Sequence, residues 1–452
     1  MEATEGVELL WCNNETNDYA CFGVDNHDPH PTNGIDLAVV HGDRQLLNPA
    51  GEGTKLGIRY HVDAVAPGET VRVRLRLTEG AALDDPFGAS FAETLAARRR
   101  EADEFYDAAI PAGVDDVDRL TARRAYAGLL WGKQLYRYSV QEWLEGDPAE
   151  PAPPPQRRRP EPAARNTGWD HLDLADVLLM PDDWEYPWFA SWDLAFHVVA
   201  LAPIDPAFAK NQILLMCREW AQHPDGQLAA YEWSFSDVNP PVHAWAALGV
   251  YNADGARDQE FLATAMSKLL LNYGWWVNRK DAAGNNLFGG GFLGMDNISL
   301  FDRSHDVPSG WRLEQSDATS WMAFFCLTML RIAQELSRTK PEWQETTTTF
   351  LERFLSICRA VESFGSGRES LWDDEDGFFY DILVSEGGEV QRVRVRSLVG
   401  LVPLLAVANS PSWVNRELPA FAARRRWLKE NRHRSMPTCS TRRARATRRA
   451  PP

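Results

Sequence analysis

The sequence predicts a mainly α-helical protein whose paired helices form an α/α toroid, preceded by a short β-rich region. Three observations lead to this fold class. Apolar and polar residues alternate near the N-terminus, helical periodicity takes over from Phe91, and long loops separate the later helix-length stretches. These loops hold the unusual aromatic and acidic residues of the chain. We therefore expect a functional site where the loops converge at one end of the helices.

The composition excludes several classes of function. The 452 residues are enough for about two or three domains, and the net charge of −17 argues against a nucleic-acid partner, which needs a basic surface. The six cysteines include no C-x-x-C pair, so neither a zinc site nor a disulfide framework is indicated. The N-terminus does not resemble a signal peptide, and no apolar run approaches the ~20 residues of a membrane span. We expect a soluble, cytoplasmic protein with no membrane partner.

Residues 1–90 are expected to form a partial β-sandwich-like region. The segment 70–77 alternates apolar with polar, mostly basic side chains, which is typical of a half-buried strand. We expect 36–41 to form a neighbouring strand and Pro67-Gly68 to form a turn between strands.

Residues 91–430 are expected to form the α/α domain. The helix-length stretches lie at 91–109, 117–138, 206–222, 240–253, 257–276, 314–337, 342–362 and 414–430. The segment 146–166 contains seven prolines and no large apolar residue, so we interpret it as an exposed loop within this domain.

Residues 431–452 differ from the rest in charge. This tail contains seven arginines and no acidic residue, and it lacks a periodic apolar pattern. We expect an irregular Arg-rich tail that is foreign to the fold, and an incomplete toroid that stops before its last helices. A basic tail that binds RNA or a membrane is the alternative.

The stretch 184–197 sets six aromatic side chains around Glu185 and Asp193. An ionised Asp among aromatic rings is costly unless a partner pairs with it. A sugar would provide that partner, because aromatic faces stack on the pyranose ring while carboxylates accept hydrogen bonds from its hydroxyls. The alternative is an aromatic-rich helix start in which backbone N–H groups satisfy Asp193.

Four further stretches combine carboxylates with aromatic or glycine residues: 226–233 with the following 239–245, 289–303, 313–321 and 371–381. The glycines of 289–294 match G-x-G-x-x-G, but no βαβ unit surrounds them, so they more plausibly present Asp296 at a loop tip. Ser316 or Asp317 is a natural helix cap, which leaves Glu314 free to point into a cleft. The acidic run of 371–381 lacks the spacing of an EF-hand and is expected to form a turn before a strand. Surface charges and turns remain the alternative for each stretch.

The chain contains no H-E-x-x-H, G-x-S-x-G or Walker motif. Carboxylates framed by aromatic residues on several loops favour glycoside hydrolysis. In that reaction one carboxylic acid protonates the leaving oxygen, and another carboxylate activates water or attacks the sugar.

The motifs WEYPWFASWDLAFH, GQLAAYEW with NPPVHAW, GGGFLGMDNISLFD and LWDDEDGFFYD resemble glycoside hydrolase family 63, the processing α-glucosidases, in its bacterial glucosidase and mannosylglycerate hydrolase-like branch. The resemblance runs from about residue 10 to 430. It implies an (α/α)6 catalytic toroid, often behind a β-rich domain. It also implies inversion of the anomeric centre, with no cofactor and no metal.

The resemblance assigns roles to individual residues. It implies that Asp296 is the general acid and that Asp193 binds hydroxyls of the glycone. Further substrate contacts are expected from Trp188, Trp192, Tyr231, Glu232, Trp233, His243 and Asn297. The general base of the family is a Glu close to the end of the toroid, and no matching Glu is found before the tail. Glu314 is the substitute candidate, because it lies on a pocket-side loop at a helix start.

These assignments predict an inverting α-glycosidase that hydrolyses a small-molecule α-glucoside or α-mannoside, with turnover reduced by the incomplete toroid. Two other classes of function remain open. The same pocket could belong to a sugar-binding protein without turnover. A sugar epimerase on an α/α toroid would instead need His as acid and base in the pocket.

Overall fold

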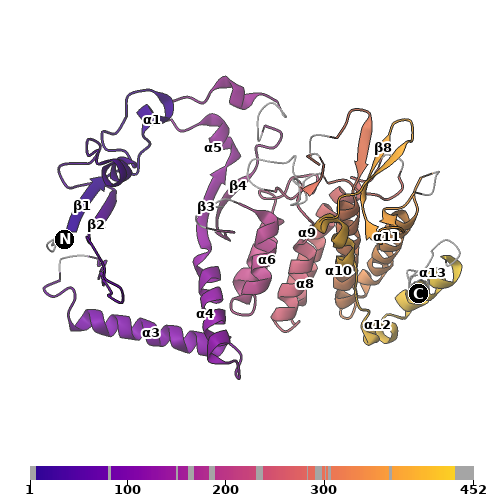
Figure 1. Cartoon of the computed structure of the whole chain (residues 1–452). Helices are drawn as coiled ribbons and strands as arrows, with labels where there is room; N and C mark the ends of the chain where they lie inside the picture. The colour runs from indigo at the N-terminus through magenta and orange to yellow at the C-terminus, as the bar shows by residue number, and fades with distance from the viewer. Residues whose placement is uncertain are drawn as a thin grey trace, which may run out of the picture. The chain divides into compact units, whose positions relative to one another are not determined.

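The computed structural model describes residues 7–79, 83–148, 151–160, 167–182, 189–230, 238–281, 284–290, 298–300, 302–303, 307–365 and 369–432. The chain divides into two compact units, Met1–Asp107 with Glu145–Pro154, and Ala108–Leu144 with Pro155–Pro452 (Figure 1). The sequence-based division at residues 90 and 430 stays a prediction.

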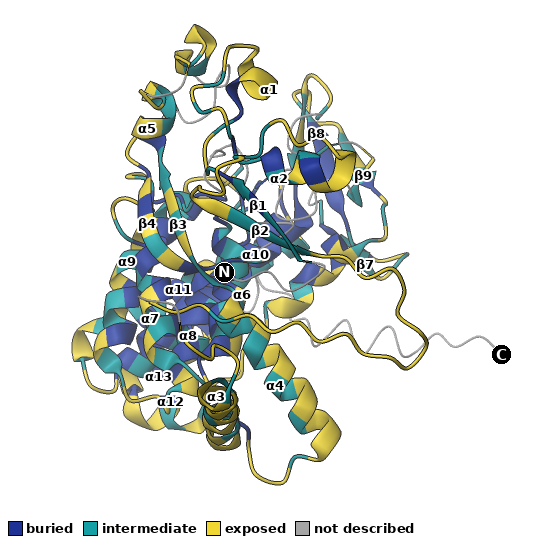
Figure 2. Ribbon diagram, turned by 90° about the vertical axis from the view of Figure 1, so that its left-hand side faces the viewer, coloured by how far each residue is buried: buried dark blue, intermediate teal, exposed yellow. Residues whose placement is uncertain are grey.

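The first unit contains a small antiparallel sheet. Strands β1 (Val7–Cys12) and β2 (Lys55–Tyr60) pair from Val7 with Tyr60 to Cys12 with Lys55. The intervening chain forms α1 (Asp18–Phe22), α2 (Gly34–Asp36) and the π-helical turn η1 (Leu37–His41). The long helix α3 (Ala89–Ala109) has no buried residue, as its exposed surface in Figure 2 shows.

Two strand predictions in this unit are wrong. Residues 36–41 are helical and end at Gly42, whose left-handed backbone (φ 72°) caps the turn, because a short apolar run cannot by its pattern be told from a buried helical turn. Residues 70–77 form no regular element. Alternation predicts which face of a strand is apolar, but a strand also needs a neighbour with which to pair, and β1 and β2 pair only with each other among the described residues.

The second unit begins with α4 (Asp116–Trp131), which ends at Gly132 where the sequence pattern predicted continued helix. Strand β3 (Lys133–Ser139) follows and pairs antiparallel with β4 (Asp173–Leu179). Between them lie α5 (Val140–Glu145) and the 3-10 turn η2 (Pro155–Arg158). In its described part, the Pro-rich segment 146–166 contains one regular element, the turn η2.

Paired helices make up most of the second unit. They are α6 (Ser191–Leu201), α7 (Pro206–Met216), α8 (His243–Ala253), α9 (Gln259–Val277), α10 (Ser316–Leu336) and α11 (Gln344–Glu362). Asp205 and Asp258 begin two of them by accepting backbone N–H groups of Phe208 and Phe261. Helices α6, α8 and α10 contact one another in turn, while α7 packs against α6, α8 and α9. The protein is thus mainly helical with paired helices, and the incomplete (α/α)6 toroid stays a prediction.

Helix α10 lies at the centre of this packing. All of its residues are buried except Phe324, Arg331 and Glu335 (Figure 2). It contacts α8, α9, α11 and the 3-10 helix η5 (Leu398–Leu405). A helix that is covered on nearly every side requires neighbours in several directions, and α8, α9, α11 and η5 provide them.

Small sheets lie near the start of α10 (Figure 1). Strand β5 (Trp311–Glu314) leads into α10 with Gln315 between them, and it pairs with β8 (Asp381–Ser385), which also pairs with β9 (Val390–Val393). The hairpin of β6 (Trp372–Asp373) and β7 (Phe378–Phe379) turns at Gly377.

The last described elements are α12 (Ser412–Glu417) and α13 (Pro419–Arg432). The predicted irregular tail lies almost entirely outside the described residues, which end at Arg432. No described helix is long and apolar enough to cross a membrane.

The aromatic contacts among α9, α10 and α11 predict the effect of a core substitution. Phe350 is 1% exposed, and its ring lies 4.9 Å from that of Tyr273, which also contacts Phe325 at 5.4 Å. We expect Phe350→Ala to lower the free energy of unfolding by about 3–5 kcal/mol, through lost burial and the cavity left behind. Chemical denaturation monitored by Trp fluorescence measures this change. Trp131→Ala is the control, because Trp131 is 82% exposed and its loss should cost about 0.5 kcal/mol or less. Equal losses in both variants would contradict the core assignment.

Candidate functional site

The start of α6 is held against the loop that precedes α8. The Ser191 hydroxyl donates to the Ala229 carbonyl at 2.7 Å, and the Ser191 N–H donates to the Ala230 carbonyl at 3.4 Å. The Asn239 side chain also donates to Ala230, at 3.3 Å. These contacts bring the first turn of α6, with Trp192 and Asp193, to the chain segment that leads into Tyr231, Glu232 and Trp233.

Gly226 fixes the other end of this loop on α9. Its φ of 100° is unfavourable for any residue with a side chain, and a Cβ atom would lie 2.2 Å from the Leu271 carbonyl oxygen. The carbonyl of Gly226 accepts hydrogen bonds from the buried side chains of Gln222 (3.0 Å) and Asn272 (2.9 Å). The loop is therefore tied to α9 before it reaches α6.

Asp193 is half-buried in the first turn of α6. Burial raises the pKa of its carboxyl, while the charge of His197 one turn later and a backbone hydrogen bond act in the opposite direction. Burial likewise lowers the pKa of His197, and Asp193 opposes that shift. The helix thus presents a carboxylate and an imidazole on adjacent turns, and both groups are partly shielded from water.

Aromatic rings connect this turn of α6 with α8. The Trp192 and Phe196 rings lie 5.9 Å apart edge to face, and the Phe196 and Trp245 rings lie 5.3 Å apart. Phe196 is 40% exposed. Partly exposed rings beside a carboxylate suit the C–H faces and hydroxyls of a sugar.

His243 begins α8 and is buried. Burial lowers the pKa of its imidazole to about 4, against a raising effect from the backbone of Ser191. Its Nε2 atom is buried and has no hydrogen-bond partner among the described residues. The ring is therefore neutral at pH 7, and it can accept or donate one further hydrogen bond.

Glu314 ends strand β5 and is 4% exposed. Burial raises the pKa of its carboxyl, and the guanidinium of Arg312, whose Nε lies 2.7 Å from Glu314 Oε1, opposes this. Asp281 raises the pKa further through its negative charge. Glu314 is thus a shielded carboxylate with a single cation that favours its ionised form.

The next residue, Gln315, holds the segment that leads into residues 291–297. Its side-chain carbonyl accepts the backbone N–H of Gly290, and Phe288 forms a β-bridge with Gln315. The Phe288 N–H also donates to the Thr319 hydroxyl at 3.0 Å.

Arg303, which follows residues 291–297 in the sequence, belongs to a buried ionic cluster. Arg303 donates from Nη1 to Asp317 Oδ2 at 2.8 Å and from Nη2 to Asp317 Oδ1, and Nη2 also lies 3.2 Å from Asp381 Oδ2. The Ser316 N–H donates to Asp381 Oδ1 at 2.8 Å. One guanidinium faces two carboxylates here, so burial and the charge of Asp317 raise the pKa of Asp381 to about 6, although Arg303 opposes the shift.

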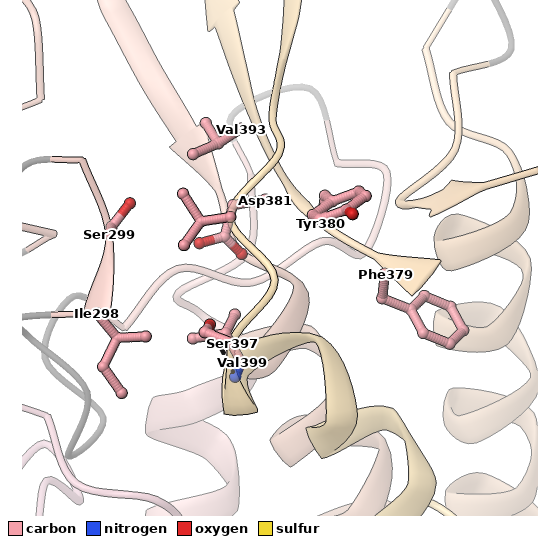
Figure 3. A pocket seen from close by; sticks show the side chains of 9 residues that line it. Ile298, Ser299, Phe379, Tyr380, Asp381, Val393, Ser397 and Val399 are labelled. Atoms are coloured by element: carbon pink, nitrogen blue, oxygen red, sulfur yellow. Dashed lines mark hydrogen bonds between the residues drawn. The ribbon is translucent and has the colours of Figure 1, made fainter. Parts of the chain in front are cut away.

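A small pocket adjoins Asp381 and has room for about one water molecule. Figure 3 shows the Asp381 side chain between Ile298 and Ser299 on one side and Tyr380 on the other, while the Phe379 ring points away from it. The pocket is too small for a sugar. Its importance is that it places Ile298 and Ser299, which follow residues 291–297, beside Asp381.

Comparison with known proteins identifies the family. A model of the mannosylglycerate hydrolase MGH1-like glycoside hydrolase domain matches residues 186–445, more than half of the chain. The chain belongs to this family. An uncharacterized protein of Saccharomyces cerevisiae, YMR196W, is 41% identical over 454 residues, a match that covers 94% of this chain and 41% of the yeast protein. The chain thus spans about two fifths of the length of that relative.

Solved structures from Thermus thermophilus are more distant. An uncharacterized conserved protein is 21% identical, with 55% of this chain and 71% of that chain covered and a TM-score of 0.39. A GH63 mannosylglycerate hydrolase in complex with glucose is 19% identical, with 54% and 72% covered and a TM-score of 0.39. These scores are too low to establish a shared architecture.

Four of the predicted site residues of this MGH1-like chain are described, namely Trp192, Asp193, His243 and Glu314. The others, Trp188, Tyr231, Glu232, Trp233, Asp296 and Asn297, lie outside the described residues. The starts of α6 and α8 come together through Ser191 and Ala230, whereas Glu314 lies at the start of α10. Their roles in substrate binding and catalysis stay predictions.

Sequence analysis missed the cluster of Arg303, Asp317 and Asp381. The expectation that Ser316 or Asp317 caps α10 is wrong: the cap residue is Gln315, and both lie in the first turn, where Asp317 binds Arg303 and the Ala318 N–H. The acidic run of 371–381 forms the expected turn, in which Asp373 accepts the backbone N–H groups of Glu375 and Asp376. The described residues contain no group of His, Cys, Asp and Glu side chains able to hold a metal ion.

The raised pKa of Asp381 predicts a pH dependence of stability. The pKa of Asp381 is near 3.8 in the unfolded protein and about 6 in the native protein. Between these pH values the native state holds a proton that the unfolded state has lost, so the stability of the native state falls as pH rises through this window. Asp381→Asn removes this titration. We expect its melting temperature, relative to that of the parent chain, to rise between pH 4.5 and 7 by an amount equivalent to roughly 2 kcal/mol. Thermal unfolding across that range measures the difference.

Asp373→Asn is the matched control with the opposite sign. Backbone hydrogen bonds together with Arg394 and Arg392 lower the pKa of Asp373, so its stabilising effect is present above the unfolded value and lost at lower pH. Its melting temperature relative to the parent chain should therefore fall as pH rises through the range below the unfolded pKa of 3.8, and it should stay nearly level between pH 4.5 and 7. The same slope for both variants would contradict the assigned charges.

Proposed function

We propose that this chain is an O-glycosyl hydrolase that hydrolyses α-glucosides or α-mannosides with inversion of the anomeric centre. The observation that carries the proposal is membership of the MGH1-like glycoside hydrolase domain family, whose match spans Asp193, Asp296 and Glu314. The substrate is a small-molecule carbohydrate, and the chemistry requires only side-chain acids and bases.

Asp296 is the proposed general acid, which gives its proton to the leaving glycosidic oxygen. Asp193 is the proposed ligand of glycone hydroxyls. Asp193 is half-buried on the helix turn whose Trp192 and Phe196 rings contact each other, and Phe196 also contacts Trp245. This supports the role, because a shielded carboxylate gains more from a hydroxyl donor than an exposed one does. Asn297, Trp188, Tyr231, Glu232, Trp233 and His243 are the remaining proposed substrate contacts.

Glu314 is the proposed general base, which activates the attacking water. Inverting hydrolysis requires an ionised carboxylate about 6.5–9.5 Å from the acid, with space for that water between them. Two observations support Glu314. Its pairing with Arg312 favours the ionised form, and the neighbouring Gln315 binds Gly290, which precedes the segment that carries Asp296.

His243 does not suit the acid role that a sugar epimerase requires. Such an enzyme needs a His that exchanges a proton with the substrate near neutral pH. Burial lowers the pKa of His243 to about 4, so at pH 7 its imidazole is neutral and lacks the protonated form that a general acid needs.

The first test is hydrolysis of a panel that includes p-nitrophenyl α-glucoside, p-nitrophenyl α-mannoside and the corresponding natural glycosides of glycerate. We expect Asp296→Asn to lower kcat on the natural glycosides by about 10³-fold or more, and by less on the nitrophenyl glycosides, whose leaving group needs little protonation. Asp193→Ala should raise KM. Asp254→Asn, in a surface pair with Lys210, is the control and should leave both constants unchanged. Thermal stabilisation by free sugars without any release would instead favour a sugar-binding protein.

The pH profile tests Glu314 as the base. Glu314→Gln should abolish turnover, whereas Arg312→Gln removes the cation that lowers the pKa of Glu314. We therefore expect the acidic limb of kcat/KM to move to higher pH in Arg312→Gln, because the base then becomes ionised only at higher pH. Arg338→Gln, which alters a distant pairing with Glu335 and Glu417, should not move it. An unchanged limb together with an active Glu314→Gln variant would exclude Glu314.

A further inference from the structure

We propose that Arg303 is a positioning residue: anchored by Asp317 and Asp381, it fixes the segment 298–303 against the start of α10 and so orients the acid residue Asp296. The catalytic part of this inference rests on the proposed function. The anchoring part concerns the described residues alone.

The anchor is a charge-assisted fork. Arg303 is fully buried, and both of its terminal nitrogens donate to the carboxylate of Asp317, while Nη2 also reaches Asp381. Such bidentate pairs fix the direction as well as the distance of the guanidinium. A Lys side chain could keep the charge but could not form the fork.

The two carboxylates come from rigid elements. Asp317 lies in the first turn of the buried helix α10, and Asp381 begins β8, which pairs with β5 on one side and β9 on the other. Asp381 also accepts the Ser316 N–H at 2.8 Å, which ties β8 directly to α10. Arg303 and the preceding Asp302 are assigned to neither helix nor strand. The ion pairs therefore fix a loop to the framework.

Both flanks of residues 291–297 are held at the same place. On the N-terminal side, Gly290 donates to Gln315 and Phe288 donates to Thr319. On the C-terminal side, Ile298 and Ser299 lie beside Asp381 (Figure 3), and Arg303 follows. Asp296 precedes Ile298 by two residues, and two residues of chain span at most about 7 Å. Holding Ile298 in place thus limits where the Asp296 carboxyl can reach.

Stability alone does not explain a buried ionic cluster. Replacing such clusters with apolar or neutral groups is often neutral for stability, because removing the ions from water costs about as much as their attraction returns. Arg303 neutralises the buried charge of Asp317, and its bidentate pairing also fixes the direction in which the loop leaves the start of α10. A displacement of about 1 Å of a catalytic group can reduce the rate by about 100-fold, so a loop that carries a catalytic acid benefits from such an anchor.

The experiment compares Arg303→Met, Arg303→Lys and the control Arg394→Met in the full chain. Arg394 pairs with Asp373 and Glu375 on the β6–β7 hairpin. For Arg303→Met we expect kcat to fall by about 100-fold with KM changed by less than about threefold, because Asp193 lies on α6. Arg303→Lys should recover part of the loss, and Arg394→Met should keep kcat within about twofold. A kcat of Arg303→Met within about threefold of the parent value would overturn the proposal.

A triple variant without the three buried charges shows whether a loss of kcat in Arg303→Met comes from misfolding. Arg303→Met combined with Asp317→Asn and Asp381→Asn leaves no unpaired buried charge, and the side-chain amide at position 381 can still accept the Ser316 N–H through its carbonyl oxygen. We expect the triple variant to fold with nearly the parent melting temperature and to show the same selective loss of kcat. Parent-like kcat in a folded triple variant would overturn the positioning role.

Hydrogen exchange separates this inference from the proposed function. In the parent chain and in Arg303→Met, amide exchange is followed in peptides covering 298–303 and in peptides of α7 and α9. Faster exchange by about tenfold, confined to 298–303, supports the anchor even if the parent hydrolyses no glycoside, in which case the proposed function alone fails. Exchange that is unchanged, or that rises throughout the unit, would overturn the anchor whatever the hydrolysis assay shows.

Discussion

The burial of α10 is the constraint on which the rest of the second unit depends. A helix with almost no exposed face leaves the N–H groups of its first turn, and the charge of Asp317, without water. Other parts of the chain must satisfy them. Asp381 from β8 accepts the Ser316 N–H, and Arg303 from the loop neutralises Asp317. The helix start therefore joins the small sheet, the loop and the helical layers into one unit.

Within α10, polar side chains are accommodated by the helix itself. The hydroxyls of Thr319, Ser320 and Thr328 donate to the carbonyls four residues earlier. Because these hydroxyls bond within α10, the three side chains can face neighbouring helices without a hydrogen-bond partner on those helices. The packing of α10 against α8, α9 and α11 can therefore be close and largely apolar. Polar links to other elements occur at both ends of the helix, such as Ser316 with Asp381 at its start and Glu335 with Tyr251 near its end.

Much of the helical framework could be predicted, because α7, α9, α10 and α11 combine apolar periodicity with clear signals such as Asp205 and Asp258 before their first turns. The strands predicted at 36–41 and 70–77 were wrong, since alternation does not specify a pairing partner. The helix predicted over 117–138 instead ends at Gly132, where β3 begins and pairs with a strand more than thirty residues away. Pairing between distant segments leaves no local pattern.

The same limit applies to the candidate site. Residue types and motifs identified Asp193, His243 and Glu314 as candidates, and the convergence of the loops on a common site stays a prediction. The described contacts join Ala230 to Ser191 at the start of α6 and to Asn239 before α8. The link between Arg303 and Asp381 could not be predicted, because it joins a loop to a strand that lies beyond two intervening helices in the sequence. Other charged residues lie near Arg303 and Asp381 in the sequence, so residue type alone does not single out either of them.

Gly226 has a consequence for how genetic variation in this protein should be interpreted. It touches the backbone of α9 so closely that any side chain would displace the loop that leads to the start of α6. In a saturation-mutagenesis screen, Gly226 would be as intolerant as a residue that contacts a ligand, although the loop meets Ser191 at its other end, through Ala229 and Ala230. Intolerance to substitution at such a glycine arises from a steric contact. A variant score that takes intolerance as a sign of a catalytic or binding role would therefore classify Gly226 wrongly as a functional residue.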